Sequence, residues 1–185
     1  MLDACWHDEF VPLPIETERL IIRSPSFEDV EAFHDIMTDE RVTEFLPIDP
    51  NASIEESRRR AERRMQHEVA HGFTLWTVVD RATGEIAGAC GFFLVEGVGP
   101  EIELAYHFSA DHWNKGFATE AAIACLRFGF EELKLGRIVA MTFPENFASR
   151  RVLEKVGMTL ERKAEYYGRD MVVYAIEDPN DISAA

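Results

Sequence analysis

Hydrophobic and polar residues alternate along this chain with two different periodicities. Apolar residues spaced by two predict strands, and apolar residues spaced by three and four predict helices. The expected strands cover residues 19–23, 73–79, 85–95, 101–108, 137–143, 160–164 and 171–176, and the expected helices cover residues 26–37, 53–71, 117–135 and 146–156. This order indicates a mixed α/β fold with an antiparallel front half and one β-α-β crossover.

Capping residues define the ends of several expected helices. The run Ser53-Ile-Glu-Glu56 has the form of a capping box, in which the serine hydroxyl accepts the amide hydrogen of Glu56. Asn146 is a favourable N-cap for the helix over 146–156, and Gly157 supplies its left-handed C-terminal residue. Gly136 is expected to end the helix over 117–135.

The chain shows no repeat, low-complexity tract or linker rich in Pro, Gly or Ser. We therefore expect a single domain over residues 16–178, with a lead-in over 1–15 and a C-terminal tail over 179–185. No apolar run reaches the roughly 18 residues of a membrane span, and the acidic N-terminus does not resemble a signal peptide.

The net charge of the chain limits the classes of partner that it is expected to bind. The 185 residues include 19 Lys and Arg against 34 Asp and Glu, which gives a formal net charge of −15. This balance argues against a nucleic-acid binder and against docking on an anionic membrane. Three scattered cysteines, Cys5, Cys90 and Cys125, form no CxxC pair and indicate reduced thiols in a cytoplasmic protein.

The segment Trp113-Asn-Lys-Gly-Phe-Ala-Thr119 lies where an expected strand gives way to a long helix. Free amides and positive dipole density at a helix N-terminus favour an anion, and Gly116 allows a phosphate to approach the backbone closely. Taken alone, the segment fits either a phosphate cradle or a tight strand–helix turn with a packing glycine. It matches neither a P-loop nor a dinucleotide fingerprint.

Three segments in order resemble the Gcn5-related N-acetyltransferase (GNAT) superfamily, and more narrowly its ribosomal-protein-alanine N-acetyltransferase (RimJ/RimL-like) branch. They are Glu103-Leu-Ala-Tyr-His-Phe108, the segment from Trp113 to Ala121, and the segment from Asn146 to Met158. The likeness covers about residues 16–178. It implies a mostly antiparallel sheet of six to seven strands, splayed in the middle and flanked by about four helices.

The resemblance implies acetyl-CoA as the cofactor. Its pyrophosphate would be held by main-chain amides of the loop that follows Trp113, namely Asn114, Lys115, Gly116, Phe117, Ala118 and Thr119. The pantetheine arm would pair with the main chain of His107 and Phe108 and accept a hydrogen bond from Asn146. Trp113 and Asn114 depart from the superfamily's usual loop, although Trp113 is common in this branch and Asn114 replaces a usual glycine.

An acetyl transfer requires a neutral amine, so a base must take the proton of the ammonium form. The resemblance gives Glu103 this role, either directly or through water, and gives Ser149 the role of proton donor to the leaving thiolate or of a pantetheine ligand. Direct attack needs no covalent enzyme intermediate. Substrate choice would lie in the first two helices, the loop over 45–51 and the hairpin over 164–171, where Tyr166 and Tyr167 would shape an acceptor pocket.

A rival motif, His67-Glu68-Val-Ala-His71, has the form of the zinc-protease signature. Helical geometry with Ala61, Met65 and Val69 as the apolar stripe points both histidines toward solvent. The neighbouring arginines, Arg58, Arg59, Arg60, Arg63 and Arg64, are expected to form a solvated face. We therefore expect no metal site.

The sequence thus predicts an N-acetyltransferase that acts on a primary amine, either a protein N-terminus or a small molecule, as a monomer or homodimer. The alternative from another class is a module that binds acyl-CoA without catalysis, and a remote alternative is a zinc metalloprotease. Residues 104–160 hold 7 basic and 6 acidic residues, so the part expected to bind the polyanionic cofactor is nearly neutral.

Overall fold

A computed structural model describes residues 13–46 and 48–183. Cys5 and most of the expected lead-in lie outside the described residues. The strands are β1 (Ile15–Glu16), β2 (Leu20–Arg23), β3 (Leu75–Asp80), β4 (Ile86–Leu94), β5 (Ile102–Phe108), β6 (Ile138–Thr142), β7 (Thr159–Tyr166) and β8 (Arg169–Ile176). The helices are α1 (Val30–Thr38), α2 (Glu40–Thr43), α3 (Ile54–His71), α4 (Phe117–Glu131) and α5 (Phe147–Lys155).

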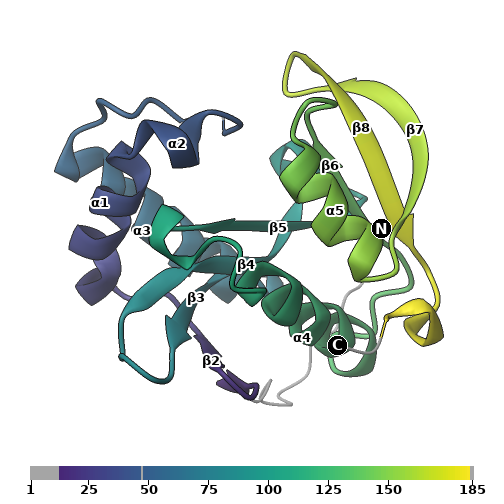
Figure 1. Ribbon diagram of the computed structural model, residues 1–185, viewed down its shortest axis with the longest axis horizontal. Helices are drawn as coiled ribbons and strands as arrows, with labels where there is room; N and C mark the ends of the chain where they lie inside the picture. The colour runs from purple at the N-terminus through teal and green to yellow at the C-terminus, as the bar shows by residue number, and fades with distance from the viewer. Residues whose placement is uncertain (1–12, 47, 184–185) are drawn as a thin grey trace.

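All eight strands form one sheet in the order β1-β2-β3-β4-β5-β6-β8-β7. Every neighbouring pair is antiparallel except β5 and β6, which run parallel and share the single registered pair Glu103–Val139. The two halves of the sheet diverge at this point (Figure 1). The expected mixed α/β fold with a sheet splayed in the middle is confirmed, and the two-residue strand β1 brings the sheet to eight strands.

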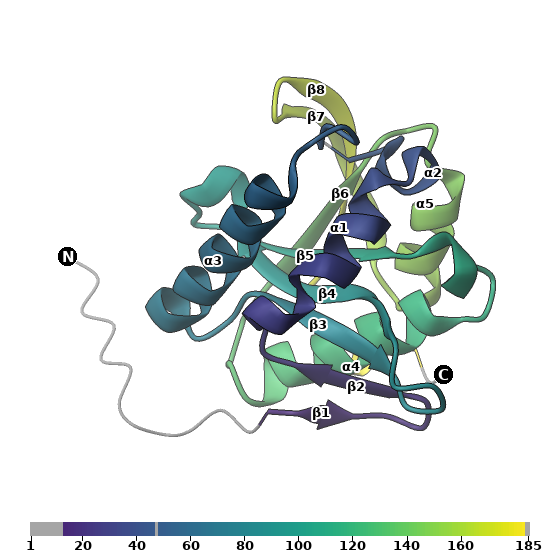
Figure 2. The same cartoon turned by 90° about the vertical axis from the view of Figure 1, so that its left-hand side faces the viewer.

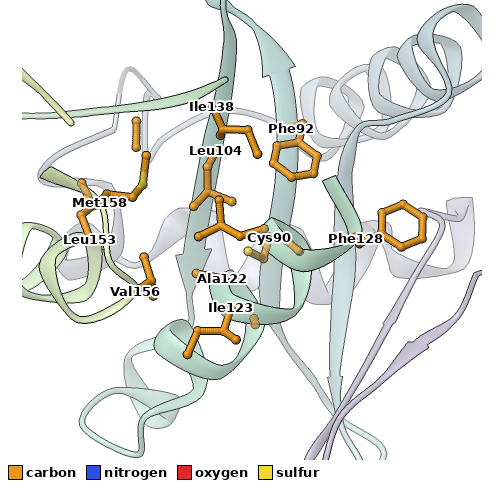
Figure 3. Packing of buried hydrophobic residues seen from close by; sticks show 14 of the residues in the cluster. Cys90, Phe92, Leu104, Ala122, Ile123, Phe128, Ile138, Leu153, Val156 and Met158 are labelled. Atoms are coloured by element: carbon orange, nitrogen blue, oxygen red, sulfur yellow. The ribbon is translucent and has the colours of Figure 1, made fainter. Parts of the chain in front are cut away.

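Two apolar layers cover opposite faces of this sheet (Figure 2). The larger lies under α4, whose Ala121, Ala122 and Leu126 pack on Cys90 and Leu104 of β4 and β5. Figure 3 shows Leu153 of α5 and Val156, which follows that helix, extending the same cluster. The smaller layer joins α1 and α2 to the other face of β3 and β4.

The helix ends follow the predicted caps with one exception. Ser53 accepts the amide hydrogen of Glu56, and Gly72 ends α3 in the left-handed conformation with φ of 76°. Gly157, with φ of 94°, follows α5 as predicted. The expected end of the long helix at Gly136 is wrong: α4 ends at Glu131, because Lys134 takes a positive φ and irregular turns complete the segment.

The predicted orientation of α3 is also wrong. Val69, assigned to its apolar stripe, is 90% exposed. The ring of His67 instead packs on Phe73 and Phe93, and its Nδ1 lies 2.8 Å from the carbonyl oxygen of Phe73. Polar side chains with long aliphatic stems thus form much of the inner face of α3, an arrangement that hydrophobic periodicity cannot detect.

The expected tail contributes to the core. Ile182 is buried beside the α4 cluster, and a side chain at Gly157 would lie 1.9 Å from the carbonyl oxygen of Asp181. None of the described helices is long and apolar enough to cross a membrane.

Candidate active site

The predicted phosphate loop lies between the end of β5 and the start of α4. Asn114 has φ of 59° and Gly116 has φ of 83°. Asparagine is one of the few non-glycine residues that tolerate the left-handed region, which explains how it replaces the glycine usual at this place. No side chain caps α4 at its N-terminus, so its first amides keep their hydrogen-bonding capacity for an anion.

Three contacts of Arg19 that sequence reasoning missed fix this loop and the first turn of α4. Nη1 of Arg19 donates to the carbonyl oxygen of Lys115 at 2.7 Å, and its guanidinium carbon lies 4.9 Å from the centre of the Phe117 ring. Nε of the same arginine donates to Glu120 at 2.7 Å. Arg19 therefore ties β2 to the first turn of α4. Only its position in the opening strand motif hinted at this role.

The main chain at the end of β5 lies beside the gap. The amide of Ser109 donates to the carbonyl oxygen of Ala87 across the ladder with β4. Because main-chain groups alternate in direction along an antiparallel pair, those of Tyr106 and Phe108 face the gap, and those of His107 face β4. Trp113 donates its indole N–H to the carbonyl oxygen of Phe108 at 2.9 Å. The predicted pairing with pantetheine thus has the amide of Phe108 available, since the Phe108 carbonyl already accepts from Trp113, whereas the main chain of His107 faces β4.

Asn146 and Ser149 lie across the gap at the start of α5. The side-chain oxygen of Asn146 accepts the amide hydrogen of Ser149 at 3.1 Å. Oγ of Ser149 lies 2.9 Å from the hydroxyl of Tyr106, which also donates to the carbonyl oxygen of Ser149 at 3.1 Å. Burial raises the pKa of Tyr106, so this hydroxyl keeps its proton. Tyr106 was not predicted as a site residue, and alternation along β5 was the only available signal.

Glu103 lies on β5 at its single registered pair with β6, and only 9% of its surface is exposed. Burial raises the pKa of its carboxyl to about 7, while hydrogen bonds from Tyr167 and from the main chain at Met141 oppose that rise. Glu103 has no ion pair with a described residue. A carboxyl group that titrates near neutral pH can exchange a proton with an amine.

Tyr167 reaches Glu103 from the turn between β7 and β8. Its hydroxyl donates to Oε2 of Glu103 at 2.8 Å and accepts the amide hydrogen of Glu96 at 3.1 Å. The carboxylate of Glu96 in turn accepts the amide hydrogen of Tyr167 at 3.1 Å. These bonds join the β4–β5 connection to the β7–β8 turn directly over Glu103.

Tyr166, the other predicted pocket residue, lies apart from that contact. Its hydroxyl accepts a hydrogen bond from Arg162 at 2.8 Å and lies 3.4 Å from Oε2 of Glu101. The two neighbouring tyrosines therefore have different surroundings, because Tyr166 ends β7 whereas Tyr167 lies in the following turn with a positive φ of 53°. Of the two, only Tyr167 contacts Glu103.

The arrangement of the histidine pair on α3 differs from that of a zinc site. The rings of His67 and His71 have centres 4.5 Å apart, and burial lowers the pKa of His67. In the described part of the chain, no three His, Cys, Asp or Glu side chains lie close enough to share a metal ion. His67 packs in the interior through the Phe73 and Phe93 rings.

Comparison with known proteins identifies the family of this chain. The model for an acetyltransferase (GNAT) domain matches residues 19–159. The uncharacterized N-acetyltransferase YoaA of Bacillus subtilis is 30% identical over 174 residues, which cover 90% of this chain and 98% of that protein. The uncharacterized protein YkkB of the same organism is 37% identical over 110 residues, which cover 59% of this chain and 64% of YkkB.

Solved structures share the fold. A GNAT-family acetyltransferase from Bacillus anthracis is 32% identical, has a TM-score of 0.76, and is matched over 89% of this chain and 98% of its own. RimL, a ribosomal L7/L12 alpha-N-protein acetyltransferase solved with coenzyme A, has a TM-score of 0.76 at 19% identity, over 92% of this chain and 99% of its own. Together, the family match, the relatives and the split sheet lead to one conclusion: the chain belongs to the GNAT family of acetyl-CoA-dependent N-acetyltransferases.

Proposed function

We propose that this enzyme transfers an acetyl group from acetyl-CoA to a primary amine, with Glu103 as the base. The observation that carries the proposal is the buried carboxyl of Glu103, whose pKa of about 7 lies near neutral pH. It lies on β5 at the strand's single registered pair with β6, next to the point where the two strands diverge.

The residues around the gap fit acetyl-CoA. The uncapped start of α4, preceded by positive φ angles at Asn114 and Gly116, offers amides to a pyrophosphate. The outward main chain of Phe108 and the side-chain amide of Asn146 offer partners to a pantetheine arm on either side of the gap. When bound there, acetyl-CoA supplies a reactive thioester.

Residues of the chain would accept one proton and supply another during the reaction. The ionised carboxylate of Glu103, directly or through one water, accepts the proton that the amine loses as its lone pair attacks the acetyl carbon. On the other side, the hydroxyl of Ser149 lies against Tyr106, and this pair either donates a proton to the departing sulfur or only holds the pantetheine. Cys90 and Cys125 are both buried in the core, so neither is suited to carry the acetyl group.

Thiol release from acetyl-CoA over a panel of primary amines tests this function, with wild type compared with Glu103→Gln. We expect amine-stimulated release in wild type and a roughly 100-fold or larger loss of kcat in the variant, in keeping with the usual contribution of a general base. Binding of acetyl-CoA should be little changed, because Glu103 is not among the proposed ligands.

Glu101→Gln is the matched control. Glu101 lies two residues away and forms an ion pair with Arg162 at 3.1 Å, so its loss should leave kcat within a few-fold of wild type. Tight binding of CoA with no release stimulated by any amine would instead indicate an acyl-CoA-binding module without catalysis.

A further inference from the structure

Two of the five arginines on α3 face the protein interior. Arg60 and Arg64 are four residues apart, so they share one face of the helix. The expected solvated face therefore holds for only some of the five. The inward pair contributes to the wall of a small cavity between α1 and α3, on the face of the sheet that these helices cover (Figure 2).

Arg64 contacts two rings but forms no ion pair among the described residues. Its guanidinium carbon lies 4.6 Å from the centre of the Phe33 ring, and Nη2 lies 3.4 Å from Nε2 of His107. Within residues 13–46 and 48–183 it makes no ion pair, and the nearby Asp29 is held by Arg23 at 2.7 Å and by Thr77 at 2.8 Å. Burial lowers the pKa of Arg64 to about 10, so it remains charged at neutral pH.

Arg60 adds a second uncompensated donor. Its Nη1 is buried and has no hydrogen-bond partner among the described residues. Arg60 forms one long ion pair, 3.8 Å between its Nε and Oε1 of Glu56, and Arg63 holds that oxygen more closely at 2.9 Å. A buried N–H without an acceptor and a buried cation without an ion pair are both costly, which favours an anion between these two arginines.

The cavity has the size and walls for one small anionic group on an apolar stem. Its volume is about 30 Å³, room for a group of roughly one or two water molecules. The apolar walls come from both helices and from the loop before α3, with Phe33 and Ile48 among them. Two neighbouring guanidinium groups, one of them with a buried Nη1 that lacks a partner among the described residues, suit a planar carboxylate.

This cavity lies on the Glu103 side of β5. Alternation along the strand places Glu103, Ala105 and His107 on one face, and His107 contacts both Arg64 and Phe33. Four residues of strand separate His107 from Glu103, a distance of about 13 Å. The amine of a molecule bound at Glu103 and a group bound at the arginines would therefore lie on the order of 10 Å apart.

We infer that Arg60 and Arg64 form a subsite for a carboxylate of the amine acceptor. This inference rests on the proposed acetyl transfer and names its substrate class: an extended amine with a carboxylate roughly 10 Å from the nitrogen. A peptide of about three extended residues spans that length, with the carboxylate at its C-terminus or on an acidic side chain. A free α-amino acid is too short, because its amine and carboxyl carbon are only about 2.5 Å apart.

Acetylation of straight-chain ω-amino carboxylates of graded length, each compared with its primary amide, tests the subsite. In wild type, kcat/KM should favour the carboxylate over its amide by roughly 10- to 100-fold at the matching length, the range for hydrogen bonds to a charged group. Arg64→Met should remove that preference while leaving acetylation of the amides within a few-fold of wild type.

Two further variants provide a second test of the subsite and a control for the change in charge. Arg60→Met should reduce the same preference, whereas Arg58→Met removes an equal charge from the exposed side of α3, where Arg58 lies against the Phe27 ring, and should leave it intact. Arg64→Met should fold, because it replaces an uncompensated cation with an apolar chain of similar length.

Several outcomes would overturn the subsite. Equal acetylation of carboxylates and amides by wild type would refute it while leaving the proposed function standing. The same holds if free acetate raises the Tm of wild type but not of Arg64→Met and fails to compete with the acceptor, since the site would then hold a free anion. If wild type acetylates no amine of either kind, the proposed function itself fails.

Discussion

Glu103 and Glu101 are the same residue type two positions apart, yet their surroundings differ. Glu101 has two arginine partners, Arg137 at 3.7 Å and Arg162 at 3.1 Å. Glu103 is buried and receives hydrogen bonds from Tyr167 and from the main chain at Met141 instead. Burial without a cation holds the pKa of Glu103 near neutral pH, and this difference is why we propose Glu103 rather than Glu101 as the base.

Tyr167→Phe tests how that pKa is set. The hydrogen bond from Tyr167 stabilises the ionised carboxylate and so lowers the pKa of Glu103, in opposition to burial. Its loss should raise that pKa, so the base form appears only at higher pH and the acid limb of the kcat profile moves upward. A pH series of thiol release measures the shift, which we expect to be up to about one unit.

Tyr166→Phe is the control for this shift. Its hydroxyl bonds Arg162 and approaches Glu101 rather than Glu103, so the limb should stay where it is in wild type. A limb that moves equally in both variants, or in neither, would mean that the Tyr167 contact does not govern the base.

At the scale of elements, the loop that joins β5 to α4 combines two left-handed residues with an uncapped helix start. Asn114→Val tests the conformational requirement, because a β-branched residue at φ of 59° costs about 1–2 kcal/mol or more. The variant should lower Tm by several degrees and weaken coenzyme A binding, both measurable by thermal unfolding and calorimetry. Asn114→Gly, which suits positive φ, should leave both unchanged; impaired binding there would point to a role for the asparagine side chain.

The elements that the sequence predicted well are those with local chemical signals. The caps at Ser53 and Asn146 and the left-handed Gly157 each depend on a few neighbouring residues. The strands follow from alternation, and the order of three motifs led to the family. Each cap, strand and motif is encoded in a short local stretch, so no tertiary knowledge was needed.

Features that depend on contacts between distant segments could not be predicted. The bond between Tyr167 and Glu103 joins residues 64 positions apart, and that between Tyr106 and Ser149 joins residues 43 apart. The orientation of α3 was misjudged because arginine and histidine pack inward there, whereas Val69 points outward. Hydrophobic periodicity assigns charged residues to solvent, and the Phe33 and His107 rings that accept Arg64 lie on other elements.

At the scale of the whole molecule, a net charge of −15 coexists with a basic cavity between α1 and α3. The overall field attracts cations, which fits an ammonium group approaching the site. The local arginine pair would then recognise a carboxylate at the other end of the same acceptor. The net charge thus sets the long-range attraction of a cationic acceptor, and the arginine contacts would set which acceptor binds.

The buried carboxyl of Glu103 also affects global stability. Its pKa is raised on folding from an ordinary value of 4.5 to about 7, so the folded state binds the proton more tightly. The stabilisation is complete below about pH 4.5 and is lost as pH rises through about 7. Glu103→Gln avoids this loss, so its unfolding free energy should exceed that of wild type by about 2–3 kcal/mol at pH 8.

Denaturant unfolding at pH 5 and pH 8 measures that difference. The advantage of Glu103→Gln should be small at pH 5 and should grow toward pH 8, while Glu101→Gln shows no such growth. A constant difference across this range would mean that Glu103 keeps an ordinary pKa in the folded protein.

The most direct test of the account is the pH dependence of amine-stimulated thiol release, measured for wild type and Glu103→Gln with the same acceptor. Wild type should show an acid limb near pH 7, where Glu103 ionises, and the variant should lose that limb together with roughly 100-fold or more of kcat. A variant that keeps both the limb and the rate of wild type would contradict the assignment of Glu103 as the base.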